Sequence, residues 1–365
     1  MLNTLSAWFA SALISLLALL QSVAGVIDDT ITTVTSTILT VPETHTPTPL
    51  PSQYSTDAIP DILLRDPQYQ RAGVIDSLPT QRVYTTDTAA ALVNILCTHT
   101  TNRMIRTTTG SGFFIEPRGV ILTNAHVAQF LLLETLEGFG ETDCVIRTGN
   151  PANDRYQAEL LYLPPSWIQE YAAAIVQDRP VGTGERDYAL LYVSASRTGE
   201  PLPAHFPALA FDTDLLSVHT ITSMVTAAGY PASKLLRTGR EIALPSQIAT
   251  TTVTDLFTFG SNYADVMALA GSAVGSFGSS GGPVLNESGK VVGLITTKGN
   301  DAVDGPGSLR AITLSYIDRT IKQETGFDLT ASIGGDLAFR ARIFQETLAP
   351  FLSAILAREL TMQRE

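Results

Sequence analysis

The sequence predicts an all-β domain, either a barrel or a sandwich, between an N-terminal hydrophobic helix and a C-terminal helical segment. From Ala89 to Ile321, short apolar runs rich in β-branched and aromatic residues are separated by Gly, Pro, Asp and Asn. Such runs are typical of strands, and their number and spacing favour an all-β domain over alternating strands and helices. Glu116–Gly119 predicts a hairpin turn, and Pro164–Val176 predicts the only internal helix, with proline at its start.

Residues 1–27 predict a cleaved signal peptide or a membrane anchor. Ala7–Ile27 holds 21 residues without a charge, and about 20 suffice to cross a bilayer. Ser22 and Ala24 are small residues of the kind that precede a signal cleavage site. A buried core helix is the alternative. Export is the better interpretation, and it places the rest of the chain outside the cytoplasm, either membrane-anchored or secreted.

Residues 28–75 predict a tether. Thr30–Pro60 is crowded with Thr, Pro and Ser. Prolines prevent regular helix, and such a segment has too little apolar surface to stabilise an ordered structure. We expect an extended linker that holds the folded domain, residues 76–325, away from a membrane.

Residues 326–365 predict a C-terminal helical segment. Apolar residues recur at near-helical spacing from Leu337 to Leu360, with an interruption at Pro350. Packing against the domain is the first expectation, and oligomerisation or contact with a membrane surface through this segment are the alternatives. Arg340 and Arg342 argue against a second membrane span.

Composition argues against nucleic acid as a partner. The formal net charge is −12, and the chain contains only four lysines and no basic run. A nucleic-acid binder needs a basic surface to neutralise phosphates. The sequence also gives no sign of a metal site or of an organic cofactor.

Cys97 and Cys144 are the only cysteines. They are either two tolerated thiols or one disulfide, and a disulfide becomes attractive in an oxidising compartment. A zinc site built on them is poorly supported, because no CxxC spacing or histidine pair accompanies them.

Three motifs carry candidate chemistry. His126 lies in GVILTNAHVAQ, Asp187 in GERDYALLYV and Ser280 in GSFGSSGGPVL. A lone histidine after a strand, or a lone aspartate before one, is more often structural. The Gly-X-Ser-Gly-Gly-Pro stretch is far more specific, and it makes the three motifs informative together.

These residue types fit nucleophilic catalysis. A serine hydroxyl is a poor nucleophile at neutral pH, so a base such as His126 must take its proton. Asp187 would fix the tautomer of that imidazole and stabilise its charged form. The backbone N–H groups of Gly278 and Ser280 would stabilise the developing oxyanion, since glycine allows the required turn.

In the order His, Asp, Ser, the motifs TNAHV, DYALL and GSSGGPV resemble the chymotrypsin-like (trypsin-like) serine peptidases, and most of all the bacterial HtrA-type branch. The resemblance covers about Val93–Ile317. It implies a double β-barrel and a serine endopeptidase that acts on protein or peptide substrates. Ser279 stands where digestive relatives carry the aspartate used in zymogen activation. Only about 45 residues follow Ile321, too few for the PDZ domain of HtrA-type relatives.

The resemblance also assigns a primary specificity pocket. By family position, it is lined by Val274, Gly275, Ser276, Thr296 and Thr297. None of these residues is acidic, which disfavours Lys or Arg at the cleavage site because an unpaired buried cation is costly. We therefore expect a preference for small or medium apolar P1 residues.

The leading interpretation is an active serine endopeptidase. The alternative is a catalytically inactive module with the same fold, tethered at the cell surface to bind peptides or proteins. An α/β-hydrolase is disfavoured, because in that fold the serine precedes the histidine along the chain.

Overall fold

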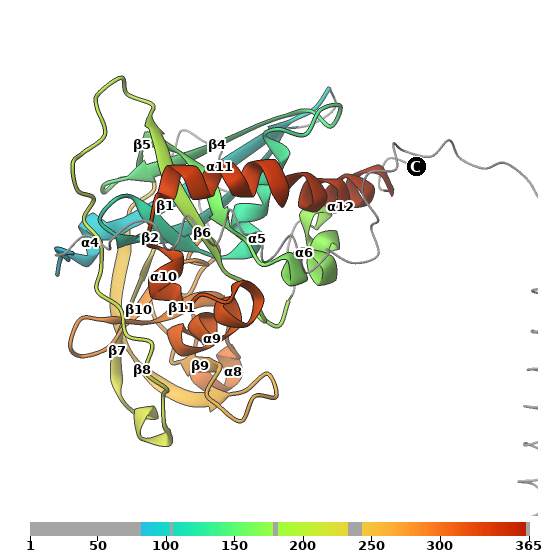
Figure 1. The fold of residues 1–365 in the computed structure, drawn as a ribbon. Helices are drawn as coiled ribbons and strands as arrows, with labels where there is room; N and C mark the ends of the chain where they lie inside the picture. Colours follow the sequence, from blue (N-terminus) through green and yellow to red (C-terminus); the bar gives the residue numbers. More distant parts are fainter. Residues whose placement is uncertain (1–81, 103–104, 178–181, 233–242, 363–365) are drawn as a thin grey trace, which may run out of the picture. The chain divides into compact units, whose positions relative to one another are not determined.

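The computed structural model describes residues 82–102, 105–177, 182–232 and 243–362. In this part of the chain, two closed six-stranded antiparallel barrels are followed by C-terminal helices (Figure 1). The structure thus confirms the double β-barrel. The predicted hydrophobic helix and the tether lie outside the described residues.

The first barrel is formed by residues 92–196. Its strands are β1 (Leu92–Thr100), β2 (Ile105–Glu116), β3 (Val120–Thr123), β4 (Glu141–Thr148), β5 (Asn153–Tyr162) and β6 (Ala189–Ser196), in the spatial order β1-β2-β3-β6-β5-β4. A short helix, α4 (Thr88–Ala91), precedes it. The predicted turn between β2 and β3 is present, with Gly119 at a φ of +97° that glycine adopts readily.

The second barrel is formed by residues 224–313. Its strands are β7 (Met224–Gly229), β8 (Gln247–Phe257), β9 (Val266–Leu269), β10 (Pro283–Leu285), β11 (Val291–Lys298) and β12 (Leu309–Thr313), in the order β10-β11-β12-β9-β8-β7. A short 3-10 turn, η3 (Val218–Thr220), precedes β7, and the short helix α8 (Asp301–Asp304) lies between β11 and β12.

A buried apolar cluster joins the two barrels. It contains Phe113 and Leu122 from the first barrel and Leu294 and Ile312 from the second. Such a cluster excludes water from the junction between the two barrels, which we call the seam. Electrostatic interactions are stronger where water is excluded.

Short helices connect the strands near this seam. The turn after β3 continues into α5 (Ala125–Ala128) and the 3-10 helix η1 (Gln129–Leu133). The predicted internal helix is confirmed as α6 (Pro165–Tyr171), which continues as the 3-10 helix η2 (Ala172–Val176). The expectation that it would be the only internal helix was wrong, because the strand-like run that ends at Thr313 turns into a further helix within the domain. After β12, α9 (Leu314–Thr325) is capped by the Thr313 hydroxyl and ends at Gly326.

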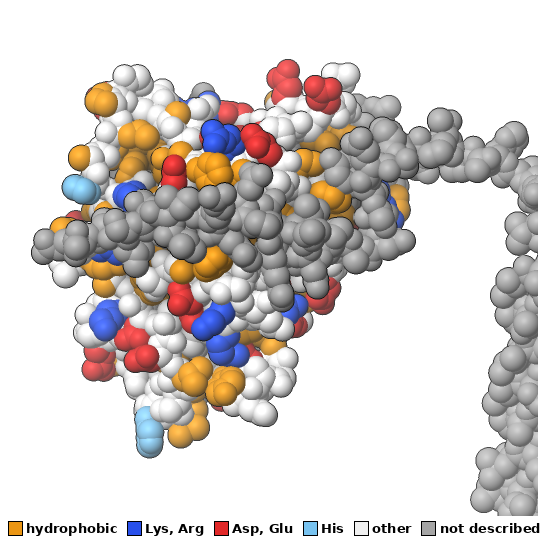
Figure 2. Space-filling view, viewed as in Figure 1, with side chains coloured by type: hydrophobic (Ala, Val, Ile, Leu, Met, Phe, Trp, Pro, Cys, Tyr) orange, Lys and Arg blue, Asp and Glu red, His pale blue; other side chains and the backbone are white. Residues whose placement is uncertain are grey.

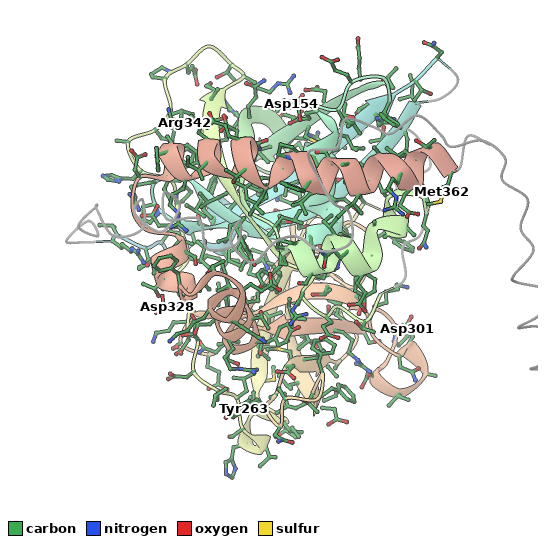
Figure 3. All side chains as sticks on the ribbon, turned by 45° about the vertical axis from the view of Figure 1, so that its right-hand side comes forward. Asp154, Tyr263, Asp301, Asp328, Arg342 and Met362 are labelled. Carbon is green, nitrogen blue, oxygen red and sulfur yellow. A yellow bond between two sulfur atoms is a disulfide. The ribbon has the colours of Figure 1, made fainter. Side chains whose placement is uncertain are left out.

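The C-terminal segment forms α10 (Leu329–Ser332), α11 (Leu337–Thr347) and α12 (Ala349–Met362). Helix α11 packs on β5 and β6, and α12 packs on η1, η2 and α6, all of the first barrel (Figures 1 and 3). Packing against the domain was the first expectation for this segment. Pro350 falls in the first turn of α12, where its missing N–H costs little.

Charged side chains of both signs are visible on the one face of the molecule that Figure 2 shows. On the face shown in Figure 2, acidic and basic groups alternate over both barrels. Among the described residues, no helix combines the length and apolarity needed to span a bilayer.

Candidate active site

His126 and Asp187 are brought together by the register of two neighbouring strands. His126 follows β3 and Asp187 precedes β6, and these strands pair through Thr123 and Ala189. The Nδ1 atom of His126 lies 2.7 Å from Asp187 Oδ2, and the His126 backbone N–H donates to Oδ1 at 2.9 Å. The carboxylate is buried. This two-point contact fixes the imidazole ring and favours the tautomer with hydrogen on Nδ1.

The first barrel also holds the Asp187 backbone. Asn124, the residue at the N-terminus of α5, donates from Nδ2 to the Asp187 carbonyl at 2.7 Å. The same nitrogen lies 3.4 Å from Thr296 Oγ1 in the second barrel. Asn124 thus connects the segments that carry His126 and Asp187 with β11.

Helix α9 holds the residue before Asp187. Arg186 has a φ of +53°, an uncommon conformation for a residue with a side chain. Its N–H donates to the Tyr316 hydroxyl at 3.1 Å, and its Nε lies 3.2 Å from Glu324 Oε1 in an ion pair without hydrogen-bond geometry. Burial raises the pKa of the Tyr316 phenol, which therefore stays neutral at physiological pH.

The turn that carries Ser280 lies against the first barrel. The Ser280 carbonyl accepts from the N–H of Ser111 on β2 at 2.7 Å. At Gly281, which has a φ of +89°, a Cβ would lie 2.0 Å from Ser111 O and 2.6 Å from Thr123 Oγ1. Glycine is therefore required here, and it lets the serine turn contact the end of the strand that leads to His126.

The Ser280 hydroxyl donates to the Thr296 carbonyl at 3.2 Å. Among the described residues, no hydrogen bond joins this hydroxyl to the His126 ring. Catalytic hydrogen bonds are often long or unaligned before substrate binds. Activation of Ser280 by His126 would therefore need this hydroxyl to turn from the Thr296 carbonyl to the imidazole.

Two backbone N–H groups beside this hydroxyl have no acceptor within the described residues: those of Gly278 and Ser280. The Phe277 carbonyl accepts from Ala232 N–H at 2.6 Å. Because a trans peptide directs its C=O and N–H to opposite sides, the Gly278 N–H points away from Ala232. A Cβ at Gly278, where φ is +92°, would lie 2.7 Å from the Ala232 Cβ.

The second donor is fixed in the same manner. The Ser279 carbonyl accepts from Gly282 N–H at 3.0 Å, so the Ser280 N–H points to the opposite side of that peptide. The hydroxyl of Ser279 donates to the Val274 carbonyl at 2.5 Å, which anchors the turn from within the second barrel. Two preorganised donors are thus available to an oxyanion.

The comparison with protein families agrees with this arrangement. A model of the trypsin-like peptidase domain matches residues 110–294, a range that contains His126, Asp187 and Ser280. The chain belongs to the trypsin-like peptidase family. The crystal structure of Deg5 matches with 18% sequence identity and a TM-score of 0.40, covering 64% of this chain and 87% of that chain. No curated protein sequence gave a significant match.

The side chains of the five residues that the resemblance assigned to the specificity pocket do not all face solvent. The Val274 side chain is fully buried in the apolar core of the second barrel. The Thr296 side chain is also buried, near Asn124 and Gly184 on the Asp187 side of the seam. Ser276 and Thr297 are partly exposed. Neither Val274 nor Thr296 therefore presents its side chain to solvent.

Gly275 packs closely against the segment before β12. A Cβ on Gly275 would lie 1.8 Å from the Gly307 carbonyl, so no side chain fits there. Lys298, at the end of β11, places its Nζ 5.8 Å from the centre of the exposed Phe277 ring. Phe277 precedes Gly278, so the Lys298 side chain lies beside the turn that carries Ser280.

Sequence reasoning missed several residues of the site. Ser111 was hidden in the strand run GSGFF, although two flanking glycines mark a close backbone approach. Asn124 is part of TNAHV, but the sequence gives no reason to direct its side chain to Asp187. No spacing rule connects Tyr316 or Glu324 with the Asp187 loop.

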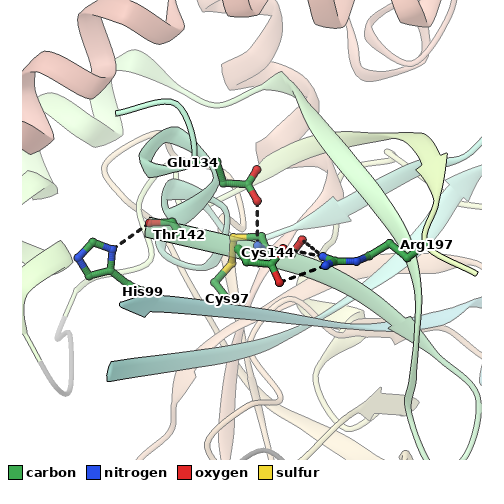
Figure 4. Close-up of a disulfide and its surroundings, with 7 residues drawn as sticks. Cys97, His99, Glu134, Thr142, Cys144 and Arg197 are labelled. Carbon is green, nitrogen blue, oxygen red and sulfur yellow. Dashed lines mark hydrogen bonds and ion pairs between the residues drawn. A yellow bond between two sulfur atoms is a disulfide. The ribbon is translucent and has the colours of Figure 1, made fainter. Parts of the chain in front are cut away.

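The two cysteines of this peptidase are bonded. Cys97 on β1 faces Cys144 on β4 in the strand register, with an S–S distance of 2.09 Å (Figure 4). Beside them, Glu134 accepts from the Cys144 N–H at 2.8 Å. Within the described residues, no group of His, Cys, Asp and Glu could hold a metal ion.

Proposed function

We propose that this trypsin-like peptidase is an active serine endopeptidase that hydrolyses protein or peptide substrates through an acyl-enzyme. The observation that carries the proposal is the oriented His126–Asp187 pair beside a serine turn with two amide donors that have no acceptor among the described residues. An inert module would not need both features at one seam.

The proposed reaction uses groups already in place. Ser280 Oγ attacks the scissile carbonyl while His126 Nε2 takes the hydroxyl proton. The oxyanion accepts hydrogen bonds from the N–H groups of Gly278 and Ser280. His126 then gives its proton to the leaving amine, and water hydrolyses the acyl-enzyme by the same route. Asp187 stays ionised and stabilises the imidazolium.

An open strand edge supports peptide binding beside Ser280. On one side, β11 pairs with β12 through Lys298, whereas on the other side its pairing with β10 ends at Leu294. Beyond Leu294, Ile295 still bonds the backbone of Gly281 and Gly282, and the Thr296 carbonyl accepts from Ser280 Oγ. Among the described strands, the part of β11 left with one unpaired edge is therefore Thr297–Lys298. An extended substrate can add to this edge as a further strand.

For the cleavage site we propose small or medium apolar P1 residues. The residues that the resemblance assigns to the pocket, Val274, Gly275, Ser276, Thr296 and Thr297, include no acidic group. Those with partly exposed side chains, Ser276 and Thr297, carry hydroxyls, and no side chain fits at Gly275, so this set offers no partner to a cationic P1 residue. Lys298 adds a positive charge near the turn, which further disfavours cationic P1 residues.

For location we propose export, either as a secreted protein or as a peptidase anchored through residues 7–27 and facing outside the cytoplasm. The uncharged N-terminal segment supports export. The Cys97–Cys144 disulfide also supports it, because disulfides persist mainly in oxidising compartments. Adding an impermeant protease to intact cells tests this: an exported domain is digested or already in the medium, and a cytoplasmic one stays intact.

One observation favours a second candidate, the inactive peptide-binding module. The Ser280 hydroxyl donates to the Thr296 carbonyl instead of to His126. If this hydrogen bond persisted when substrate bound, no base would activate the serine.

A fluorophosphonate probe distinguishes the two candidates in the purified full-length chain. We expect the probe to form an adduct at Ser280, located by mass spectrometry, and the protein to cleave unfolded casein. Ser280→Ala removes both signals. Ser288→Ala, which changes an exposed serine in the β10–β11 turn, retains both. A folded wild type that takes no label and cleaves no casein supports the inactive module.

A further inference from the structure

Ser111 on β2 uses its hydrogen-bonding groups to contact three separate segments of the site. Its N–H donates to the Ser280 carbonyl at 2.7 Å, and its carbonyl accepts from Thr123 Oγ1 at 2.7 Å. Its hydroxyl accepts from the Tyr230 N–H at 2.8 Å and donates to the Gly278 carbonyl at 2.7 Å. Ser111 is fully buried. A first-barrel residue therefore joins the serine turn, the segment after β7 and the strand that leads to His126.

The hydroxyl contact constrains the oxyanion donor. Gly278 lies between two peptide units, and each is held by one hydrogen bond to its carbonyl. Ala232 N–H holds the Phe277 carbonyl, and Ser111 Oγ holds the Gly278 carbonyl. Because peptide units are planar, fixing both units limits rotation about the φ and ψ of Gly278. The direction of the Gly278 N–H is then set before substrate arrives.

We propose that Ser111 is a positioning residue for the oxyanion hole, and that its hydroxyl keeps the Gly278 N–H directed at the reacting carbonyl. This inference rests on the proposed peptidase function. A hydroxyl suits the position because it is a small group that accepts and donates at once. An alanine would leave the Tyr230 N–H and the Gly278 carbonyl buried without a partner.

The first test measures steady-state kinetics of Ser111→Ala in the full-length chain, with a casein peptide that the wild type cleaves. A displaced donor acts on the transition state, so we expect kcat to fall by about 10- to 100-fold with KM within about twofold. The aldehyde of the same peptide, which forms an oxyanion at Ser280, should bind more weakly by a similar factor.

Ser353→Ala is the matched control. Ser353 is also a buried serine whose hydroxyl donates to a carbonyl distant in sequence, that of Leu132 at 3.1 Å, but it lies on α12 and, among the described residues, has no hydrogen bond to the serine turn or to His126. Ser353→Ala should also lower stability, because it removes one buried hydrogen bond where Ser111→Ala removes two, and it should keep the wild-type kcat. Equal falls of kcat in Ser111→Ala and Ser353→Ala would overturn the proposal, as would a wild-type kcat in Ser111→Ala.

If Ser111→Ala does not fold, a second variant, Ser111→Gly, allows the same kinetic test. Ser111→Gly removes one more carbon and leaves space of the order of one water molecule, which can bond both orphaned groups. We expect its kcat to lie between those of wild type and Ser111→Ala. A folded Ser111→Gly protein with the full wild-type kcat and aldehyde affinity would count against the role of the hydroxyl.

Hydrogen exchange separates this inference from the proposed function. If the wild type has no activity, the peptidase proposal fails, and amide exchange over residues 276–283 then decides the role of Ser111. Faster exchange there in Ser111→Ala than in Ser353→Ala supports the positioning role. Unchanged exchange overturns it.

Discussion

Removal of the disulfide gives a prediction whose size follows from the structure. Cys97 and Cys144 close a loop with a sequence separation of 47. In the chain-entropy model, a disulfide that closes a loop of this length raises the free energy of the unfolded chain by about 4 kcal/mol at 25 °C. Both side chains are buried, so alanine substitutions also leave small cavities. We expect Cys97→Ala/Cys144→Ala to lower the free energy of unfolding by about 2–4 kcal/mol.

The assay is urea unfolding, followed by circular dichroism, of wild type and double variant with and without reductant. Reductant should lower the unfolding midpoint of wild type only. Strands β1 and β4 carry neither His126, Asp187 nor Ser280. The kcat of the folded double variant should therefore stay within about twofold of wild type, since distant sites are usually independent.

Two results would refute this reasoning. One is a wild-type midpoint that reductant does not change, even though the reduced cysteines are shown to be alkylated. The other is a native protein, kept without reductant, in which both cysteines react with an alkylating agent. The first would show that loop closure contributes nothing to stability, and the second that the bond is not formed.

Three further predictions concern single side chains. Gly278→Ala should lower kcat by about 100-fold or more in a folded protein, because a Cβ at φ +92° displaces the oxyanion donor; a wild-type kcat would contradict this. Glu324→Ala should destabilise the chain by about 2–3 kcal/mol in urea unfolding, because the hydroxyls of Tyr162 and Ser166 lose their acceptor and Arg186 its ion-pair partner. Desolvation by the surrounding protein raises the pKa of the Glu134 carboxyl to about 7, although much of the side-chain surface is exposed. Wild-type stability should therefore fall as pH rises from about 4.5 to 7, where the unfolded chain has already released this proton. Glu134→Gln should remove this fall in stability, which we expect to total less than about 1 kcal/mol because solvent at the exposed side chain screens the charge; unfolding curves at pH 5 and 8 measure it.

The strands could be predicted from the sequence because their signal is local. GVILTNA and DYALLYVS carry β-branched and aromatic residues between turn-forming residues, and they became β3 and β6. No local signal predicts that the barrels close, because closure pairs β1 with β4 and β7 with β10, and long stretches of chain separate these strands. From composition and pattern alone, a barrel and a sandwich were equally acceptable, and the resemblance to a family gave the double barrel.

For the candidate site, too, local motifs could be recognised in the sequence, whereas the three-dimensional arrangement could not. The sequence motifs identified His126 and Asp187, and the register of β3 with β6 explains why they meet. The direction in which each side chain points was harder to predict from the sequence. Val274 and Thr296 were assigned to a pocket by position, yet both side chains are buried in the protein interior. Which face a residue presents depends on local bulges, and β11 has one between Ile295 and Thr297.

The contacts at the seam are reciprocal, and this has a consequence for how the site fails. Ser111 of the first barrel holds the serine turn of the second. Tyr316, on the helix after the second barrel, holds the residue before Asp187. Each barrel therefore positions a group that belongs to the other. A small shift between the barrels would break these hydrogen bonds while both apolar barrel cores stayed intact.

Activity should therefore be lost before the barrels unfold. Local opening requires less free energy than global unfolding. An apolar cluster holds the barrels together, but the alignment of the site across it depends on a few directional polar contacts such as those of Ser111. In increasing urea, we expect casein cleavage to fall at concentrations where circular dichroism remains native. Ser111→Ala should widen this gap, because it weakens the seam more than the cores. Coincident loss of activity and of strand signal in both proteins would show that the seam is as stable as the barrels it joins.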